Sequence, residues 1–160
     1  LKRGQPNHYL MKDANNGVAK FISVAKTTTK YPLVIATRYN IPFLLDYPGI
    51  GMSCSLKSTN IQICLLGNQV EGEIFEVDTK MLKVLDILEE YPQWYDRQVL
   101  ELQTPQSLND CYVYLLKTFP QKLLSLPHIT SYEDTPDKKY LERSQRLSIL
   151  ARDDLEFGIN

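Results

Sequence analysis

The sequence lacks most of the features that take a chain out of the ordinary globular class. Cysteine is scarce: Cys54, Cys64 and Cys111 are an odd number without CxxC spacing, which disfavours a disulfide framework and a zinc site. No run approaches the ~18 consecutive apolar residues of a membrane span, and no Asn-X-Ser/Thr glycosylation site occurs. The net charge is -1, so the basic stripe of a nucleic-acid-binding protein is missing. We therefore expect no nucleic-acid or membrane partner, no metal and a cytoplasmic location.

What the sequence does contain fits one folded domain. Its 160 residues are enough to bury roughly 70% of the surface of the unfolded chain. The 43% hydrophobic and 23% charged residues are typical of globular proteins. We expect a domain over residues 1–135 and a charged C-terminal tail over 136–160. The tail is compatible with a helix over 139–150 or with a mobile segment.

Most of the chain has the pattern of β-strands. Between Gln69 and Val77, apolar residues alternate with glutamates, which is typical of a half-buried strand. Residues 104–109 contain Pro, Ser and Asn between two apolar runs, which is the composition of a hairpin loop. Strands are predicted over 19–25, 31–36, 40–45, 69–77, 96–103 and 110–117.

One internal helix is predicted after the fourth of these strands. Asp78 and Thr79 are both favourable N-caps. Pro92 stops the helix, because the residue before a proline is biased away from helical conformation. The apolar positions in between have the i, i+3, i+4, i+7 spacing of a helix with one buried face: Met81, Val84, Leu85 and Leu88.

Three carboxylates lie at the end of this helix, and helical geometry separates them. At about 100° per residue, Asp86 lies about 150° and Glu90 about 170° from the centre of the apolar face, so both are expected to point to water. Glu89 lies about 90° away, at the rim of that face and in the last turn. Partial burial and the helix dipole both raise a carboxyl pKa there, which suits a general base and acid near neutral pH. From spacing alone, a surface glutamate at a helix end is the simpler interpretation.

Short motifs occur in a distinctive order along most of the chain. They are found at residues 1–8 (LKRGQPNH), 31–35, 40–42, 48–49, 70–73 (VEGE), 85–97 (LDILEEYPQWYDR), 113–114, 126–128 and 131–132. Each is weak alone, but their order and spacing resemble the γ-glutamylcyclotransferase-like family, most closely its γ-glutamylamine cyclotransferase branch. The resemblance implies an α+β fold, a small twisted, partly closed β-barrel with surrounding helices.

The resemblance also implies an enzyme that cyclises γ-glutamyl groups to 5-oxoproline and releases a free amine, in the nearest branch the side-chain nitrogen of lysine. In that family the catalytic acid comes three residues after the Asp of a Leu-Asp pair, here Asp86. This gives the role of catalytic base to Glu89. Tyr95 and Tyr114 match aromatic positions that line the substrate pocket, with core packing as the alternative. The chemistry requires no metal or organic cofactor, and we expect a monomer.

Two features depart from the family pattern. The family's substrate-binding loop reads Tyr-Gly-Thr-Leu-(Lys/Arg)-x-Gly after a hydrophobic strand, and this sequence begins at the leucine. Only Leu1 is therefore expected to represent the first part of that loop. Residues 52–67 resemble an insertion, because removing them restores the family spacing between 48–51 and 68–72. We expect an addition at a turn.

Other interpretations remain open at this stage. A non-catalytic member of the same fold, binding a small acyl ligand or a protein, is favoured by both departures. An unrelated small β-barrel interaction module requires no role for Glu89. A nucleophile paired with His8 or His128 has no supporting motif, and the acids within 153–156 fit a solvated tail better than a metal site.

Overall fold

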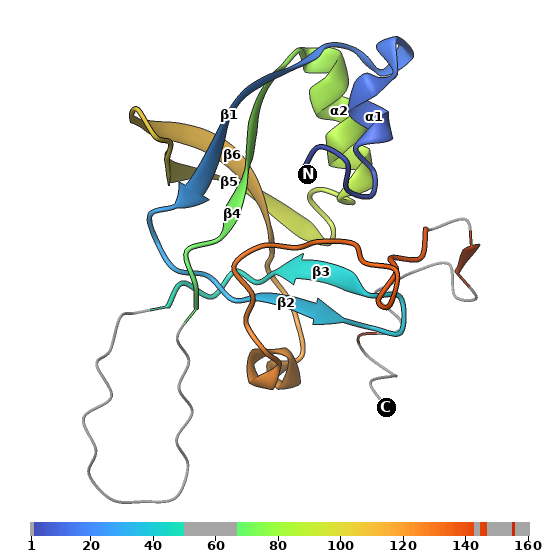
Figure 1. Ribbon diagram of the computed structural model, residues 1–160, viewed down its shortest axis with the longest axis vertical. Helices are drawn as coiled ribbons and strands as arrows, with labels where there is room; N and C mark the ends of the chain where they lie inside the picture. Colours follow the sequence, from blue (N-terminus) through green and yellow to red (C-terminus); the bar gives the residue numbers. More distant parts are fainter. Residues whose placement is uncertain (1, 50–66, 143–144, 147–154, 156–160) are drawn as a thin grey trace, which may run out of the picture.

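The fold combines two antiparallel sheets with short helices (Figure 1). The computed structural model describes residues 2–49, 67–142, 145–146 and 155. The helical elements are α1 (Tyr9–Lys12), η1 (Ala14–Asn16), α2 (Thr79–Leu88) and η2 (Gln121–Ser125). The strands are β1 (Ala19–Thr27), β2 (Leu33–Ala36), β3 (Ile41–Leu44), β4 (Glu71–Val77), β5 (Tyr95–Gln103) and β6 (Leu108–Leu116).

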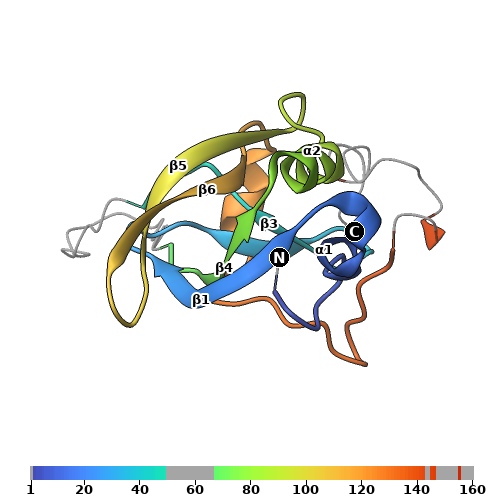
Figure 2. The same cartoon turned by 90° about the horizontal axis from the view of Figure 1, so that it is seen from above.

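The larger sheet has the strand order β4-β1-β5-β6, and all of its pairs are antiparallel. β1 pairs with β4 from Ala19 to Lys26, but it pairs with β5 only through Lys26 and Thr27. The β1–β4 and β5–β6 pairs therefore meet at one end and diverge toward the other (Figures 1 and 2). Since α2 connects the end of β4 with the start of β5, it spans the divergent side.

The smaller sheet consists of β2 and β3 and runs beneath the larger one in Figure 1. Single bridges join it to the rest: Leu45 pairs in parallel with Leu116, and Leu33 pairs with Ile129. In the part of the chain that the structure describes, the strands do not close into a barrel. The predicted α+β class is confirmed, whereas the twisted, partly closed β-barrel stays a prediction.

The hydrophobic core lies between the smaller sheet, the end of β6 and η2. Phe43, Leu45 and Leu116 are fully buried in it. In β3 the buried and half-buried residues alternate, because successive side chains of a strand point to opposite faces. No residue of this cluster belongs to α2, whose buried Met81 lies outside it.

The segment predicted as a tail contributes to this core. Leu155 belongs to the buried cluster, and Tyr140 and Leu141 pack against it. Residues 139–142 are not helical. Instead, the backbone N–H of Leu141 donates to the carbonyl of Tyr39 at 3.1 Å. A helix over 139–150 is therefore wrong for its described start, because tertiary contacts hold this stretch in an irregular path.

All six predicted strands are present, with shifts at their ends. The strand predicted from residue 31 starts at Leu33, because Tyr31 pairs with Asn68 instead. The predicted hairpin loop is confirmed: the backbone N–H of Thr104 donates to Ser107 O at 2.9 Å. The sequence did not predict α1, η1 or η2, which are too short to show a helical period.

The two ends of the suspected insertion lie side by side. Gly49 pairs with Lys30, and Asn68 pairs with Tyr31, the next residue along. A Cβ added to Gly49 would lie 3.3 Å from the backbone nitrogen of Gly67. Residues 52–66 are outside the described residues, so the insertion stays a prediction. The described residues on either side of positions 50–66 nevertheless lie next to each other.

Candidate active site

Asp78 fixes the start of α2. Its Oδ1 accepts a hydrogen bond from Met81 N at 2.7 Å, and its Oδ2 accepts one from Val18 N at 3.0 Å. Of the two predicted N-caps, Asp78 and Thr79, Asp78 is the one that caps the helix, and the same side chain ties the helix to the chain entering β1. Gly17 permits this approach, because a Cβ there would lie 2.5 Å from Asp78 Oδ1 and its φ is +116°.

Hydrogen bonds at its C-terminus end α2 at Leu88, before the chain reaches Pro92. Glu89 is the C-cap, and Glu90 takes the left-handed conformation with a φ of 52°. The backbone N–H groups of Glu90 and Tyr91 donate to the carbonyls of Ile87 and Asp86 at 3.3 and 2.9 Å. This pair of bonds is a Schellman motif. It turns the chain sharply just after Glu89.

A cavity of about 700 Å³ lies between the diverging strand pairs. Its walls come from both sheets, from α2, from the N-terminal loop (residues 2–8) and from the C-terminal segment (residues 131–142 and 145–146). The apolar face of α2 forms one wall through Leu82, Leu85 and Leu88. The predicted residues Glu89, Tyr95 and Tyr114 line the same cavity.

Glu89 is the acid whose environment fits proton transfer. It is half-buried in the cavity wall. Desolvation by the surrounding protein raises the pKa of its carboxyl from 4.5 to about 7. Burial thus acts in the direction expected from the place of Glu89 at the rim of the helix. A carboxyl that titrates near neutrality can both accept and return a proton at that pH.

The other two acids do not point to water, contrary to the expectation from helical spacing. Asp86 accepts two hydrogen bonds from Arg97 Nη1, at 2.6 and 2.8 Å, and one from the Tyr114 hydroxyl at 2.6 Å. Its side chain is only 23% exposed, because these partners on β5 and β6 cover that side of the helix. Glu90 is half-buried and lines the cavity. A prediction from the apolar residues alone therefore underestimates how much of the surface of α2 is covered by other parts of the protein.

The two tyrosines predicted to line the pocket, Tyr95 and Tyr114, line the cavity and also have structural roles. The Tyr114 hydroxyl donates to Asp86, and burial together with this bond raises its pKa. Tyr95 is 7% exposed, belongs to the core cluster and packs edge-on against Trp94. Burial, followed by the charge of Glu89, raises the pKa of Tyr95. Both phenols therefore stay protonated at neutral pH, and the alternative of core packing applies to Tyr95.

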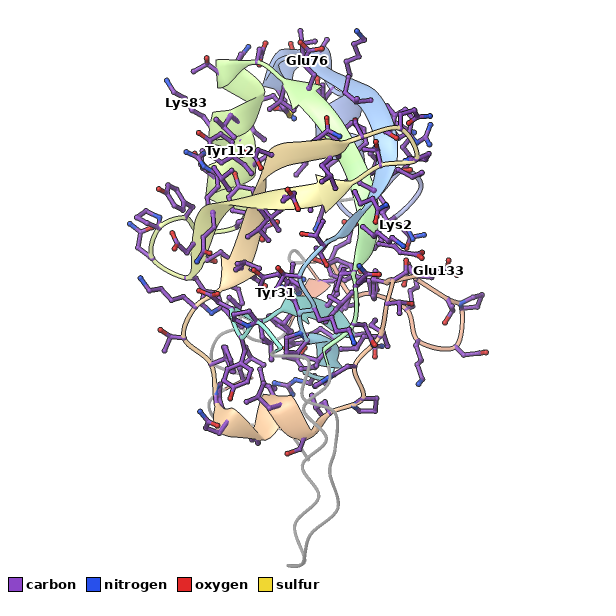
Figure 3. The ribbon with its side chains drawn as sticks, turned by 90° about the vertical axis from the view of Figure 1, so that its left-hand side faces the viewer. Lys2, Tyr31, Glu76, Lys83, Tyr112 and Glu133 are labelled. Carbon is purple, nitrogen blue, oxygen red and sulfur yellow. The ribbon has the colours of Figure 1, made fainter. Side chains whose placement is uncertain are left out.

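Sequence reasoning missed the residues that close the cavity from the two ends of the chain. The N-terminal loop and the C-terminal segment run beside each other, as the neighbouring labels of Lys2 and Glu133 in Figure 3 illustrate. Side chains from both segments line the cavity. The bonds that join them run from Lys2 Nζ to Ser131 Oγ at 2.6 Å, from Asp134 N to Gln5 Oε1 at 2.7 Å and from Asn7 Nδ2 to Tyr140 OH at 3.2 Å.

No local signal could have found this closure, because its partners are about 130 positions apart in the sequence. Only the short motifs at 1–8 and 131–132 marked the two segments. Leu1 lies outside the described residues, so its predicted contact with substrate stays a prediction.

Other candidate chemistries find less support. Among the described residues, no group of three or more His, Cys, Asp or Glu could hold a metal ion. Cys111 lines the cavity, but burial raises its thiol pKa, opposite to what a nucleophilic cysteine needs. His8 is buried against Phe75, and burial lowers its pKa. None of the helices in the described part of the chain has the length and apolar character to cross a membrane.

Comparison with known proteins agrees with this site. Residues 1–134 match the family described as γ-glutamyl cyclotransferase, AIG2-like. A Drosophila melanogaster protein, provisionally named a γ-glutamylcyclotransferase, is 44% identical over 158 residues, covering 98% of this chain and 90% of that protein. The γ-glutamylaminecyclotransferase C of Danio rerio is 39% identical over 154 residues, covering 91% of each.

A solved structure shares the fold. The crystal structure of an AIG2-like protein from Mus musculus superposes with a TM-score of 0.75 at 38% identity, covering 91% of this chain and 92% of that one. The resemblance drawn from the order of the motifs is thereby confirmed, as is the expectation that the chain belongs with enzymes named as cyclotransferases. The chain is a member of the γ-glutamyl cyclotransferase, AIG2-like family.

Proposed function

We propose that the chain is a γ-glutamylamine cyclotransferase with Glu89 as its general base and acid. The observation that carries the proposal is Glu89 itself, a half-buried carboxyl in the wall of the cavity with a pKa raised to about 7. The name of the Danio rerio relative supports a γ-glutamyl-amine as the substrate. The substrate proposed is γ-glutamyl-ε-lysine, and the enzyme acts as a cytoplasmic monomer without a cofactor.

The proposed reaction is an intramolecular acyl transfer. The α-amine nitrogen of the substrate bonds to the γ-carbonyl carbon, and the bond from that carbon to the lysine nitrogen breaks. The α-ammonium loses two protons and the departing nitrogen gains two, so no water or redox partner is consumed. Glu89 carries these protons from one nitrogen to the other. The products are 5-oxoproline and lysine.

The enclosing residues supply the geometry for this reaction. Folding the glutamyl chain inside the cavity brings amine and carbonyl together, which is the main advantage of an intramolecular reaction. In this proposal Tyr95 and Tyr114 form the wall beside Glu89. Backbone N–H groups of the N-terminal loop, which includes Leu1, stabilise the oxyanion.

The direct test is release of 5-oxoproline from γ-glutamyl-ε-lysine. We expect Glu89→Gln to lower kcat/KM by about 10²- to 10⁴-fold, because the general base and acid is lost. In the wild-type protein, kcat/KM should rise as the pH passes about 7, where Glu89 becomes a carboxylate. The matched control is Glu90→Gln, which removes the neighbouring acid and should change kcat/KM only a few-fold.

Two outcomes would contradict the proposal. An equal decrease of kcat/KM in Glu89→Gln and Glu90→Gln would mean that Glu89 is wrongly assigned as the base. No release from γ-glutamyl-ε-lysine or γ-glutamyl-alanine by a folded wild-type protein would favour the non-catalytic binding module instead.

A further inference from the structure

Arg146 is a cation in the cavity wall that has no carboxylate partner among the described residues. It is half-buried and lines the cavity. Arg3 and Arg97, by contrast, are paired with Glu73 and Asp86. A guanidinium that is withdrawn from water and left unpaired is a favourable place for a carboxylate, which it binds through charge-assisted hydrogen bonds.

The guanidinium of Arg146 is held in one orientation. Nε donates to Leu141 O at 2.9 Å, and Nη2 donates to the Tyr140 hydroxyl at 2.7 Å. Its central carbon lies 5.6 Å from the ring centroid of Tyr39 and 5.2 Å from that of Tyr140. Nη1 makes no hydrogen bond to the described part of the chain. The group is thus positioned before a ligand arrives, which lowers the entropic cost of binding.

A second unused donor lines the same cavity. The Tyr132 hydroxyl is buried and has no hydrogen-bond partner among the described residues. Buried polar atoms are nearly always paired. Because Tyr132 is a residue of the cavity wall, its unpaired hydroxyl points to a ligand atom. Burial, followed by the charge of Asp134, raises its pKa to about 12. The group is therefore neutral at physiological pH and able to donate.

We propose that Arg146 and Tyr132 form a carboxylate-binding subsite of the cavity. The inference rests on the proposed function, because a γ-glutamyl-amine has a carboxylate beside its α-amine and γ-glutamyl-ε-lysine has a second one on the leaving amine. Lys2 also lines the cavity, but its ammonium already donates to Ser131 Oγ and Tyr132 O. Arg146 lies beyond the matched residues 1–134, so the C-terminal segment supplies the charge.

Three ligands that lack the α-amine of the glutamyl group, and therefore cannot cyclise, distinguish the two sources of the carboxylate. Glutaryl-ε-lysine has both carboxylates, N-butyl glutaramate has only the glutamyl one, and Nε-butyryl-lysine has only the one on the leaving amine. Binding is measured by calorimetry with the wild-type protein and Arg146→Gln. The matched control is Lys139→Gln, which removes an exposed positive charge from the same segment. Melting temperatures verify that each variant is folded.

We expect Arg146→Gln to weaken glutaryl-ε-lysine binding about 10- to 100-fold, the usual effect of losing a hydrogen bond to a charged group. Lys139→Gln should bind as the wild type does. If Arg146→Gln loses affinity for Nε-butyryl-lysine, the subsite binds the carboxylate of the leaving amine. If it loses affinity for N-butyl glutaramate, the subsite binds the carboxylate of the glutamyl group.

Unchanged affinity for all three ligands in folded Arg146→Gln overturns the subsite. If that protein still releases 5-oxoproline, the proposed function survives and the subsite alone fails. A wild-type protein that binds none of the ligands and releases no 5-oxoproline overturns both.

Tyr132→Phe provides an independent measurement. Without ligand its melting temperature should be equal to or higher than that of the wild type, because an unpaired buried hydroxyl is removed. Its affinity for glutaryl-ε-lysine should fall about 3- to 10-fold. The control is Tyr9→Phe, at a side chain that is 58% exposed. Unchanged affinity of Tyr132→Phe for glutaryl-ε-lysine would show that this hydroxyl is not part of the subsite.

Discussion

At the scale of single residues, neighbouring positions of one helix end have different chemistry because their surroundings differ. Asp86 is satisfied by Arg97 and Tyr114. Glu89, three positions later, lies in the wall of the cavity and is desolvated. Desolvation favours the neutral form of a carboxyl, so the pKa of Glu89 is raised. The difference follows from which side of α2 each residue occupies.

This shift has a consequence for stability. The pKa of Glu89 is about 7 in the folded protein and about 4.3 in an unfolded chain. The folded state therefore binds more protons between these values, and stability is lost as the pH rises through about 7. Glu89→Gln should be more stable than the wild type at pH 8 by about 3.5 kcal/mol, and about equal to it at pH 4. Urea unfolding at several pH values measures the difference, and the same difference at all pH values would contradict the assigned pKa.

At the scale of elements, α2 is fixed at both ends by carboxylates that reach other elements. Asp78 joins its start to the chain before β1. Asp86 joins its last turn to Arg97 on β5 and Tyr114 on β6. The position of Glu89 therefore depends on strands that are distant from it in the sequence.

Removing the charge of Asp86 should loosen this attachment. Asp86→Asn leaves the half-buried Arg97 without its ion-pair partner, so we expect a loss of about 1–3 kcal/mol in the free energy of unfolding. The matched control is Glu76→Gln on the exposed Lys20–Glu76 pair, whose side chains are 71% and 70% exposed. That pair should contribute less than about 1 kcal/mol. Equal effects of the two substitutions in denaturant unfolding would mean that Asp86 does not anchor the helix.

At the scale of the whole molecule, the two ends of the chain close one side of the cavity together. The N-terminal loop is bonded to residues 131–140, and Leu155 lies in the core. The suspected insertion, by contrast, begins and ends at adjacent pairs beside Lys30 and Tyr31. Additions at that place need not disturb the cavity.

Excision of residues 52–66 tests this directly. Joining Gly51 to Gly67 leaves Ile50 and Gly51 to connect positions 49 and 67, which are already in contact. These four residues would form a turn in which Gly51 takes the third position, where a type II turn favours glycine. We expect cooperative unfolding with an unchanged or higher melting temperature, since a shorter loop costs less closure entropy. Loss of the cooperative transition would show that these residues are part of the fold.

Much of the local structure was predictable from the sequence. The alternation in 69–77, the capping residue Asp78 and the apolar spacing after it are signals within a few positions, and the corresponding elements formed. The order of the motifs identified the family and selected Glu89 among three acids. The exposure of Asp86 and Glu90 was predicted wrongly, because the apolar face of a helix does not show which polar side is covered by strands.

The sequence by itself determined the strands, the helix and the family, since these depend on neighbouring residues or on motif order. Only the tertiary structure decided that Asp86 is an anchor, that a cavity separates the strand pairs, and that Tyr132 and Arg146 line the same cavity as Glu89. The physical reason is that burial and desolvation come from groups far apart in the chain. Their proximity is set by how the elements pack, which no local pattern records.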